Sequence, residues 1–173
     1  MDWSRIRAFA FDVDGVFTDG GVLCDLQGEL YRTFDAKDGF AVRMAAMNRY
    51  PVAIITGGRS VSLRERFLTS GVPAEDIFLG ARDKEELLQQ FCRRHELTPE
   101  QVLYIGDDIP DIGVLRRVGC AVCPSDAVPE VQAVCHVVSP FPGGKGCVRH
   151  AIETVMKAQG RWVFDVQLYK ALF

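Results

Sequence analysis

Short apolar runs alternate along this chain with longer segments whose apolar residues recur at helical spacing. Apolar runs bounded by Gly or turn residues are typical of strands buried on both faces of a parallel sheet. The runs expected to form strands lie at 8–11, 51–55, 76–80, 102–105, 120–122 and 136–138. Helices are expected between them, over about 38–47, 60–70, 83–96, 111–118 and 146–159. This alternation predicts an α/β fold built on a doubly wound, mainly parallel sheet.

Residues 16–34 follow a different pattern, directly after the first strand. Two short strand-like pieces flank a polar turn near Asp25–Gly28. This arrangement predicts a β-hairpin that projects from the edge of the sheet. No repeat, low-complexity tract or linker divides the chain, so residues 1–173 are expected to form one domain.

Composition and charge narrow the partners and the location. Of the 173 residues, 48% are hydrophobic and 25% are charged, which is usual for a soluble globular protein. The net charge of −3 gives no electrostatic reason to expect nucleic acid or an anionic membrane as a partner. There is no signal-peptide pattern and no apolar run of the ~20 residues that a membrane span needs, so we expect a cytoplasmic protein. The six cysteines are then expected to be free thiols, and Cys120 and Cys123 to be core residues rather than metal ligands.

Polar residues stand at the ends of three predicted strands. They are Asp12, Asp14, Thr56, Gly57, Asp107, Asp108 and, one turn later, Asp111. Right-handed crossovers bring successive strand ends to one edge of the sheet, which is where open α/β folds bind their ligands. Lys84 begins the helix after the third strand and can reach the same edge.

This set of side chains suits a metal ion and a phosphoryl group. Carboxylate oxygens are the ligands that Mg²⁺ prefers, while a hydroxyl, backbone N–H groups at a helix start and a lysine bind phosphate. The alternative is that each acid is an isolated cap or surface residue, since Asp is common in turns. Three such motifs in order on matching strand ends argue against coincidence.

The motifs resemble those of the haloacid dehalogenase superfamily. The matching segments are Asp12–Gly15, Thr56–Gly57, Lys84 and Gly106–Asp111, in the superfamily's order and on the expected elements. The resemblance implies that Asp12 is the nucleophile that takes the phosphoryl group. It implies that Asp14 is the general acid for the leaving alkoxide and then the general base for water. Thr56, Gly57 and Lys84 would bind the phosphoryl oxygens.

The same resemblance implies a Mg²⁺ cofactor. Its ligands would be the carboxylates of Asp12 and Asp107 and the backbone carbonyl of Asp14. Asp108 and Asp111 would orient Lys84 or the waters of the metal. Asp14 favours phosphatase chemistry, because a dehalogenase needs neither a second aspartate in the first motif nor Mg²⁺.

The spacing of the motifs leaves no room for a cap domain. Superfamily members that use a cap insert it after the first motif or between the second and third. Only 41 residues separate Asp14 from Thr56, and 27 separate Thr56 from Lys84. These lengths are used up by the hairpin, two helices and a strand. We therefore expect a neighbouring subunit to cover the active site.

Capless members of this length form families that this chain resembles at Gly15–Gly20, Asp38–Gly39 and Gly143–Arg149. These are the phosphatases of 3-deoxy-D-manno-octulosonate 8-phosphate (KDO 8-phosphate), a lipopolysaccharide precursor, and of nonulosonate 9-phosphates. The resemblance implies a phosphorylated sugar acid as substrate and a homotetramer in which the hairpins pack together. It also implies that the late glycine loop and the tail help to close the site. The tail, Trp162–Phe173, is too apolar for a frayed terminus and is expected to pack on the chain's own core or across an interface.

Arg59, Gly144 and Arg149 are the candidate residues for binding the sugar acid. Many relatives read Thr-Gly-Arg after the second strand, whereas Gly58 intervenes here before Arg59. The choice between an eight-carbon and a nine-carbon substrate stays open. A third possibility is a non-catalytic oligomerisation domain of the same fold, although such a domain would not need the complete catalytic set.

Overall fold

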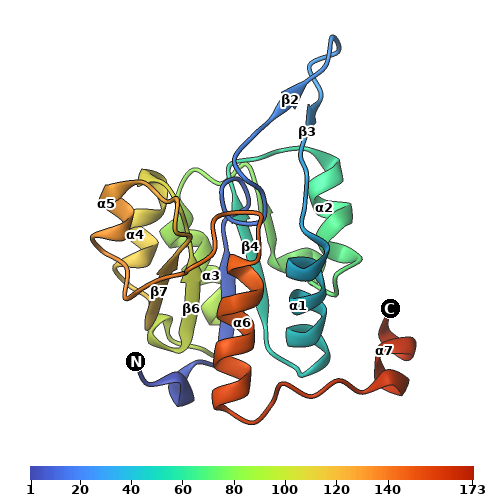
Figure 1. The fold of residues 1–173 in the computed structure, drawn as a ribbon, viewed down its shortest axis with the longest axis vertical. Coiled ribbons are helices and arrows are strands. Elements are labelled where there is room, and N and C mark those ends of the chain that lie inside the picture. The colour runs from blue at the N-terminus through green and yellow to red at the C-terminus, as the bar shows by residue number, and fades with distance from the viewer.

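A computed structural model describes residues 1–173 (Figure 1). Its centre is a six-stranded sheet in the order β5-β4-β1-β6-β7-β8, with every neighbouring pair parallel. The strands are β1 (Ala8–Phe11), β4 (Val52–Thr56), β5 (Ile77–Leu79), β6 (Val102–Ile105), β7 (Cys120–Cys123) and β8 (Val137–Val138). The predicted doubly wound parallel sheet is confirmed.

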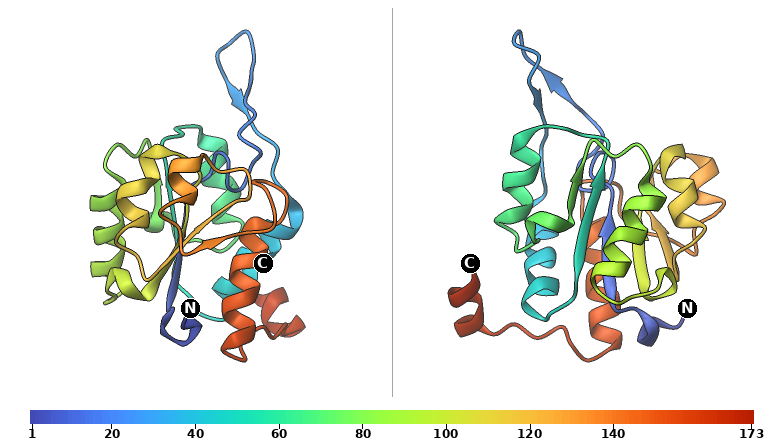
Figure 2. Two further views of the ribbon diagram at one scale, coloured as in Figure 1. Left: turned by 60° about the vertical axis from the view of Figure 1, so that its left-hand side comes forward. Right: turned by 180° about the vertical axis from the view of Figure 1, so that it is seen from behind.

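Helices cover both faces of this sheet (Figure 2). The α-helices are α1 (Ala36–Met47), α2 (Val61–Leu68), α3 (Lys84–Arg94), α4 (Ile112–Leu115), α5 (Pro129–Gln132), α6 (Cys147–Ala158) and α7 (Val166–Leu172). The 3₁₀ helices are η1 (Trp3–Arg5), η2 (Ala74–Asp76), η3 (Pro99–Gln101) and η4 (Ile109–Asp111). Residues of α1, α2 and α6 share one apolar core, and residues of α3, α4 and α5 share the other. No helix is both long enough and apolar enough to span a membrane.

The central strand β1 is buried on both faces. Phe9 and Phe11 pack in the core with α1 and α6, while Ala8 and Ala10 face the opposite core. The ring of Phe17, in the loop after β1, lies 5.3 Å from the ring of Phe11 in an edge-on contact. This aromatic contact anchors the loop that carries the first pair of aspartates.

The strand order places the ends of β4, β1 and β6 side by side. From β1 the chain continues outward through β4 to β5, and then returns to the other side of β1 with β6. The order therefore reverses between β1 and β6, which is the position where open α/β sheets hold ligands.

The predicted hairpin is present as β2 (Leu23–Cys24) and β3 (Leu30–Tyr31), which pair antiparallel. We call residues 21–33 the hairpin arm. The carboxylate of Asp25 shapes its turn by accepting hydrogen bonds from the backbone N–H groups of Gln27 and Glu29 and from the hydroxyl of Tyr31. The arm projects far from the body of the molecule (Figures 1 and 2).

Three helical segments differ most from the sequence prediction. The helix expected over 111–118 is reduced to η4 and the one-turn α4, and the one-turn α5 was not expected. A Cβ at Gly119, just before β7, would lie 1.8 Å from the carbonyl oxygen of Glu100, so this close approach requires glycine. The tail forms α7, which the sequence did not predict, and Arg43 of α1 donates a 2.7 Å hydrogen bond to the hydroxyl of Tyr169. The tail thus packs on α1 at the surface, and no residue of α7 is buried.

Candidate active site

The carboxyl edge of the sheet holds a cavity of about 530 Å³. It is lined by all the polar residues that were singled out at the strand ends, together with Gly57 and Lys84; the polar set is Asp12, Asp14, Thr56, Asp107, Asp108 and Asp111. Residues up to 99 positions apart in the chain therefore meet at one place. The topology brings them together because β4, β1 and β6 are neighbours in the sheet.

Lys84 joins two acids at the floor of the cavity. Its ammonium nitrogen lies 2.9 Å from Oδ2 of Asp12 and 2.8 Å from Oδ1 of Asp111. Lys84 is fixed by its position at the start of α3, where Asp83 caps the helix by accepting a hydrogen bond from the N–H of Glu86. Burial alone would lower the pKa of Lys84, but the charges of Asp12 and Asp111 outweigh it and raise the pKa. The lysine therefore stays charged at neutral pH.

Asp111 is completely buried and uses both of its carboxylate oxygens. Oδ1 accepts from Lys84 and, at 2.6 Å, from the hydroxyl of Tyr104. Oδ2 accepts from the backbone N–H groups of Asp107 at 3.2 Å and Asp108 at 3.4 Å. Of the two roles that the resemblance left open for Asp111, orienting Lys84 or the waters of a metal, the contact with Lys84 is present, and Asp111 also holds the loop after β6.

The acids of this site outnumber the cation that faces them. Burial raises the pKa of Asp12 to about 6, with Asp111 adding to the shift and Lys84 opposing it. Burial raises the pKa of Asp107 to about 7, and the nearby Asp12 and Asp111 add to it. Carboxylates so close together hold protons above their usual range unless a further positive charge joins them.

A divalent cation fits this environment. Carboxylate oxygens of Asp12, Asp107 and Asp111 lie within 4.8 Å of one another. Because Asp111 is already engaged by Lys84 and Tyr104, the oxygens of Asp12 and Asp107 are the better donors. An all-oxygen donor set is what Mg²⁺ requires.

Glycine at position 15 makes room for Asp107. Its backbone has a φ of +78°, which favours glycine, and a Cβ there would lie 2.0 Å from Oδ2 of Asp107. The loop is tightened by Thr18, whose hydroxyl oxygen accepts from the N–H groups of Gly15 and Gly20. The glycine of the first motif thus allows the carboxylate of Asp107, in the fourth motif, to approach the loop that carries Asp12 and Asp14.

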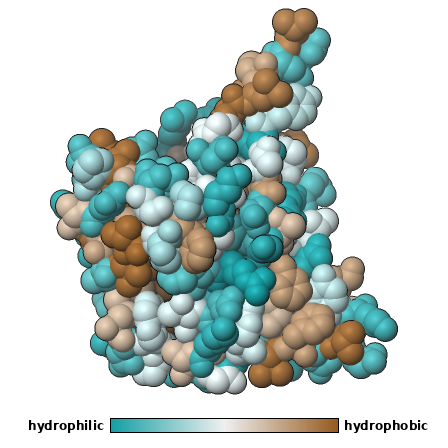
Figure 3. Space-filling view, in the orientation of Figure 1, coloured by the Kyte–Doolittle hydropathy of each residue, from teal (hydrophilic) through white to brown (hydrophobic).

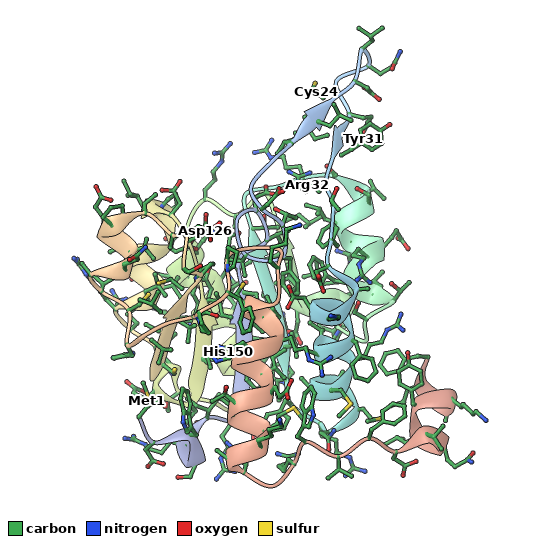
Figure 4. The ribbon with its side chains drawn as sticks, viewed as in Figure 1. Met1, Cys24, Tyr31, Arg32, Asp126 and His150 are labelled. Atoms are coloured by element: carbon green, nitrogen blue, oxygen red, sulfur yellow. The ribbon has the colours of Figure 1, made fainter.

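Asp14 has a partner that the sequence analysis missed. Arg32, from the hairpin arm, places Nε 2.5 Å from Oδ1 and Nη2 3.1 Å from Oδ2 of Asp14. Figure 4 shows Arg32 at the root of the arm, where it joins the body. The charged hydrogen bond to Asp14 raises the pKa of Arg32.

The structure does not bring Arg59, Gly144 or Arg149 to this cavity. The side chain of Arg59 lies against Gly80, with Nε 3.2 Å from where a Cβ of Gly80 would stand. Arg149 lines a separate cavity beside α6 and pairs with Glu153 at 2.9 Å. As binding residues for the sugar acid, the three stay predictions; within one chain, none of them lines the cavity that holds the carboxylates.

Arg82 is the exposed arginine that lines the carboxylate cavity instead of Arg59. The insertion of Gly58 shifts Arg59 along the loop, whereas Arg82 lies two positions before Lys84. This short distance from Lys84 in the sequence could have indicated that Arg82 lies near the site.

Gly144 packs against the loop after β1, which carries Asp12 and Asp14. Its N–H donates to the carbonyl of Val16 at 2.9 Å, and a Cβ there would lie 2.6 Å from the carbonyl carbon of Thr18. Buried Asp38 anchors the same late loop by accepting from the N–H groups of Gly146 and Arg149. Burial raises the pKa of Asp38 to about 6, although these two hydrogen bonds oppose the shift.

Comparison with known proteins places the chain in a family. The family model described as haloacid dehalogenase-like hydrolase matches residues 59–151. The KDO 8-phosphate phosphatase KdsC of Yersinia pestis is 35% identical over 158 residues, covering 91% of this chain and 83% of the relative. Its crystal structure superposes with a TM-score of 0.89 over 92% of this chain and 85% of that chain.

Two further solved structures hold ligands. The KDO 8-phosphate phosphatase of Moraxella catarrhalis, in complex with magnesium, phosphate and KDO, is 29% identical with a TM-score of 0.88. That alignment covers 92% of this chain and 91% of the other. The cobalt-bound phosphatase of Haemophilus influenzae is 31% identical with a TM-score of 0.89, covering 99% of each chain.

The chain belongs to the haloacid dehalogenase-like hydrolases. Within them it is a phosphatase with a capless α/β core and a projecting hairpin.

Proposed function

We propose that this protein is a Mg²⁺-dependent phosphatase that hydrolyses KDO 8-phosphate to KDO and phosphate. The observation that carries the proposal is the cavity in which Asp12, Lys84 and Asp107 meet at the switch point of the sheet. The relatives at 33–35% identity are KDO 8-phosphate phosphatases, which supports the choice of substrate.

Asp12 is the nucleophile in this proposal. Its Oδ1 accepts from the N–H of Val13 at 2.7 Å and its Oδ2 from Lys84, so the carboxylate is held in one orientation. Asp12 attacks phosphorus, the bond from phosphorus to the sugar oxygen breaks, and an aspartyl-phosphate forms. Asp14 gives a proton to the leaving alkoxide. It then takes a proton from the water that attacks phosphorus, which releases phosphate and restores Asp12.

Thr56, Gly57 and Lys84 bind the transferring phosphoryl group. Thr56 is buried at the end of β4, and its hydroxyl oxygen accepts from the N–H of Gly58 at 3.1 Å. Its hydroxyl hydrogen is then available to a phosphoryl oxygen, beside the ammonium group of Lys84. The carboxylates of Asp12 and Asp107 and the backbone carbonyl of Asp14 would hold Mg²⁺. When bound, the metal would neutralise charge that builds on the phosphoryl oxygens.

Arg82 is the cation we assign to the carboxylate of the sugar acid. Lys84 and Arg32 are each paired with an aspartate, whereas Arg82 has no carboxylate within ion-pair distance. In KDO 8-phosphate the carboxylate and the phosphate are at opposite ends of the sugar chain. An exposed arginine at the rim suits the end that lies away from Asp12, and its planar guanidinium can bind a carboxylate through two hydrogen bonds.

We also propose that the protein works as a homotetramer in which a neighbour covers the site. The arm exposes Leu23, Leu26 and Tyr31, with Leu26 at its turn wholly exposed. Figure 3 shows hydrophobic residues gathered on the arm. An exposed apolar strand pair supports packing of arm against arm.

Phosphate release from KDO 8-phosphate tests the function directly. We expect turnover with Mg²⁺, loss of turnover on chelation, and no turnover by Asp12→Asn. The matched control is Asp19→Asn, which changes an exposed aspartate in the same loop. Substantial hydrolysis by Asp12→Asn would disprove the aspartyl-phosphate mechanism.

Assays on a nonulosonate 9-phosphate in parallel decide the chain length of the substrate. Discrimination is the ratio of the two values of kcat/KM. A higher value for the nine-carbon substrate would replace our assignment. Failure to hydrolyse any phosphorylated sugar acid would favour a non-catalytic oligomerisation domain.

A further inference from the structure

The pair formed by Arg32 and Asp14 connects the hairpin arm to the catalytic loop. The guanidinium binds both oxygens of Asp14, at 2.5 Å and 3.1 Å. Only 5% of the Arg32 side chain is exposed, compared with 35% of the Asp14 side chain. A buried guanidinium bound to both oxygens fixes the direction of a carboxylate as well as its position.

Arg32 is itself held from two other directions. Its Nη1 lies 3.3 Å from the carbonyl oxygen of Leu30, in β3, and 3.4 Å from the hydroxyl oxygen of Ser60, which precedes α2. The guanidinium therefore joins the arm, the start of α2 and the loop after β1. Asp14 accepts no other side-chain or backbone hydrogen bond, so its orientation depends on Arg32.

We propose that Arg32 is a positioning residue for the acid–base chemistry of Asp14. This inference rests on the proposed phosphatase mechanism, in which Asp14 hands a proton to the leaving alkoxide. Proton transfer requires the carboxyl group to lie within hydrogen-bond reach of the leaving oxygen, at an angle that one side-chain rotamer provides. Without Arg32 the partly exposed carboxylate can adopt several rotamers, and fewer of them point at that oxygen. The root of the arm is thereby part of the catalytic apparatus.

The dependence on the leaving group separates this role from a merely structural one. A sugar alkoxide is a poor leaving group and needs the proton, whereas p-nitrophenolate leaves without one. For both substrates kcat/KM reports the steps up to transfer of the phosphoryl group to Asp12. Arg32→Gln should lower kcat/KM for KDO 8-phosphate by about 30- to 300-fold, around the lower end of the roughly 100- to 10,000-fold that general acid catalysis contributes, because Asp14 itself is retained. For p-nitrophenyl phosphate we expect a loss of about threefold or less, because that step needs no general acid.

Two variants complete the test. Arg32→Lys keeps one charged donor beside Asp14 and should recover part of the lost activity toward the sugar phosphate. Arg93→Gln removes an arginine from an exposed pair with Glu86 on α3 and should leave both substrates unaffected. Thermal unfolding of each variant verifies that it is folded.

Equal losses on the two substrates would show that Arg32 acts on the fold or on phosphate binding, and would overturn the inference. Unchanged activity toward the sugar phosphate would overturn it as well. Should the wild-type enzyme prefer a different alkyl phosphate, that substrate replaces KDO 8-phosphate in the comparison. The proposed substrate would then have failed while the role of Arg32 is still decided. An enzyme that hydrolyses no phosphate ester would refute both proposals.

Discussion

Replacement of Gly15 by alanine should damage catalysis far more than folding. The left-handed backbone at φ +78° costs an alanine about 1–2 kcal/mol. The new Cβ would lie 2.0 Å from Oδ2 and 2.4 Å from Cγ of Asp107. Since non-bonded carbon contacts are optimal at about 3.5–4.0 Å, the carboxylate must move by more than about 1 Å. It can do so by rotating, because it is the end of a side chain, and the total loss of stability should stay near about 2 kcal/mol.

The functional loss follows from the displaced carboxylate. Misplacement of a catalytic group by about 1 Å costs on the order of 100-fold in rate. We expect Gly15→Ala to lower kcat/KM by about 100-fold and to raise the Mg²⁺ concentration needed for half-maximal activity. The melting temperature should fall by only about 4–8 °C, as a chain of this length loses about 2–4 °C per kcal/mol. Phosphate release titrated with Mg²⁺ and thermal unfolding measure the two effects.

Gly20→Ala is the matched control in the same loop. Gly20 has a φ of +81°, but a Cβ there would have no neighbour closer than 3.9 Å. It carries the same backbone cost without touching Asp107. If both variants lose activity equally, or if Gly15→Ala keeps the wild-type Mg²⁺ dependence, the reasoning about Asp107 is wrong.

Three further predictions concern substrate, metal and assembly. Arg82→Gln should raise KM for KDO 8-phosphate about tenfold, whereas Arg59→Gln should leave it unchanged. A larger rise in KM for Arg59→Gln than for Arg82→Gln would contradict the assignment. The folded-state pKa values of Asp12 (about 6) and Asp107 (about 7) lie above their ordinary value, so the folded state binds more protons than the unfolded state near pH 5. With the metal removed by a chelator, the free energy of unfolding should therefore fall as pH rises from 5 to 8. Mg²⁺ should therefore raise the melting temperature more at pH 8 than at pH 5.5, and an equal rise at both would count against a site on these acids. Leu26→Lys should reduce the molar mass measured by light scattering, and an unchanged mass would exclude the arm tip from the interface.

The sequence alone was enough to predict the centre of the site. Asp12, Thr56 and Asp107 each follow an apolar run directly, so placing the strands places the residues. Lys84 begins a helix with a clear cap at Asp83, which fixed its direction as well.

Contacts that depend on the path of a loop could not be predicted. Arg32 lies in a segment predicted as an exposed hairpin, and nothing in its spacing relates it to Asp14. Arg82 lines the cavity and Arg59 does not, because of the way in which the loop after β4 turns at Gly58. Buried Asp38 was noted only for its likeness to related sequences, and its role as an anchor for α6 emerged from contacts across more than 100 residues.

The late glycine loop also limits how this enzyme can diverge. A Cβ at Gly143 would lie 2.0 Å from the carbonyl oxygen of Gly15, and the N–H of Gly143 donates a hydrogen bond to the carboxylate of Asp126. Because this contact is between two backbone segments, no substitution of a neighbouring side chain can make room for a larger residue at Gly143. Evolution toward a new substrate is therefore closed at this loop and open at the rim, where the exposed Arg82 lines the cavity. A laboratory library for altered specificity should vary Arg82 and keep the glycines of the late loop fixed.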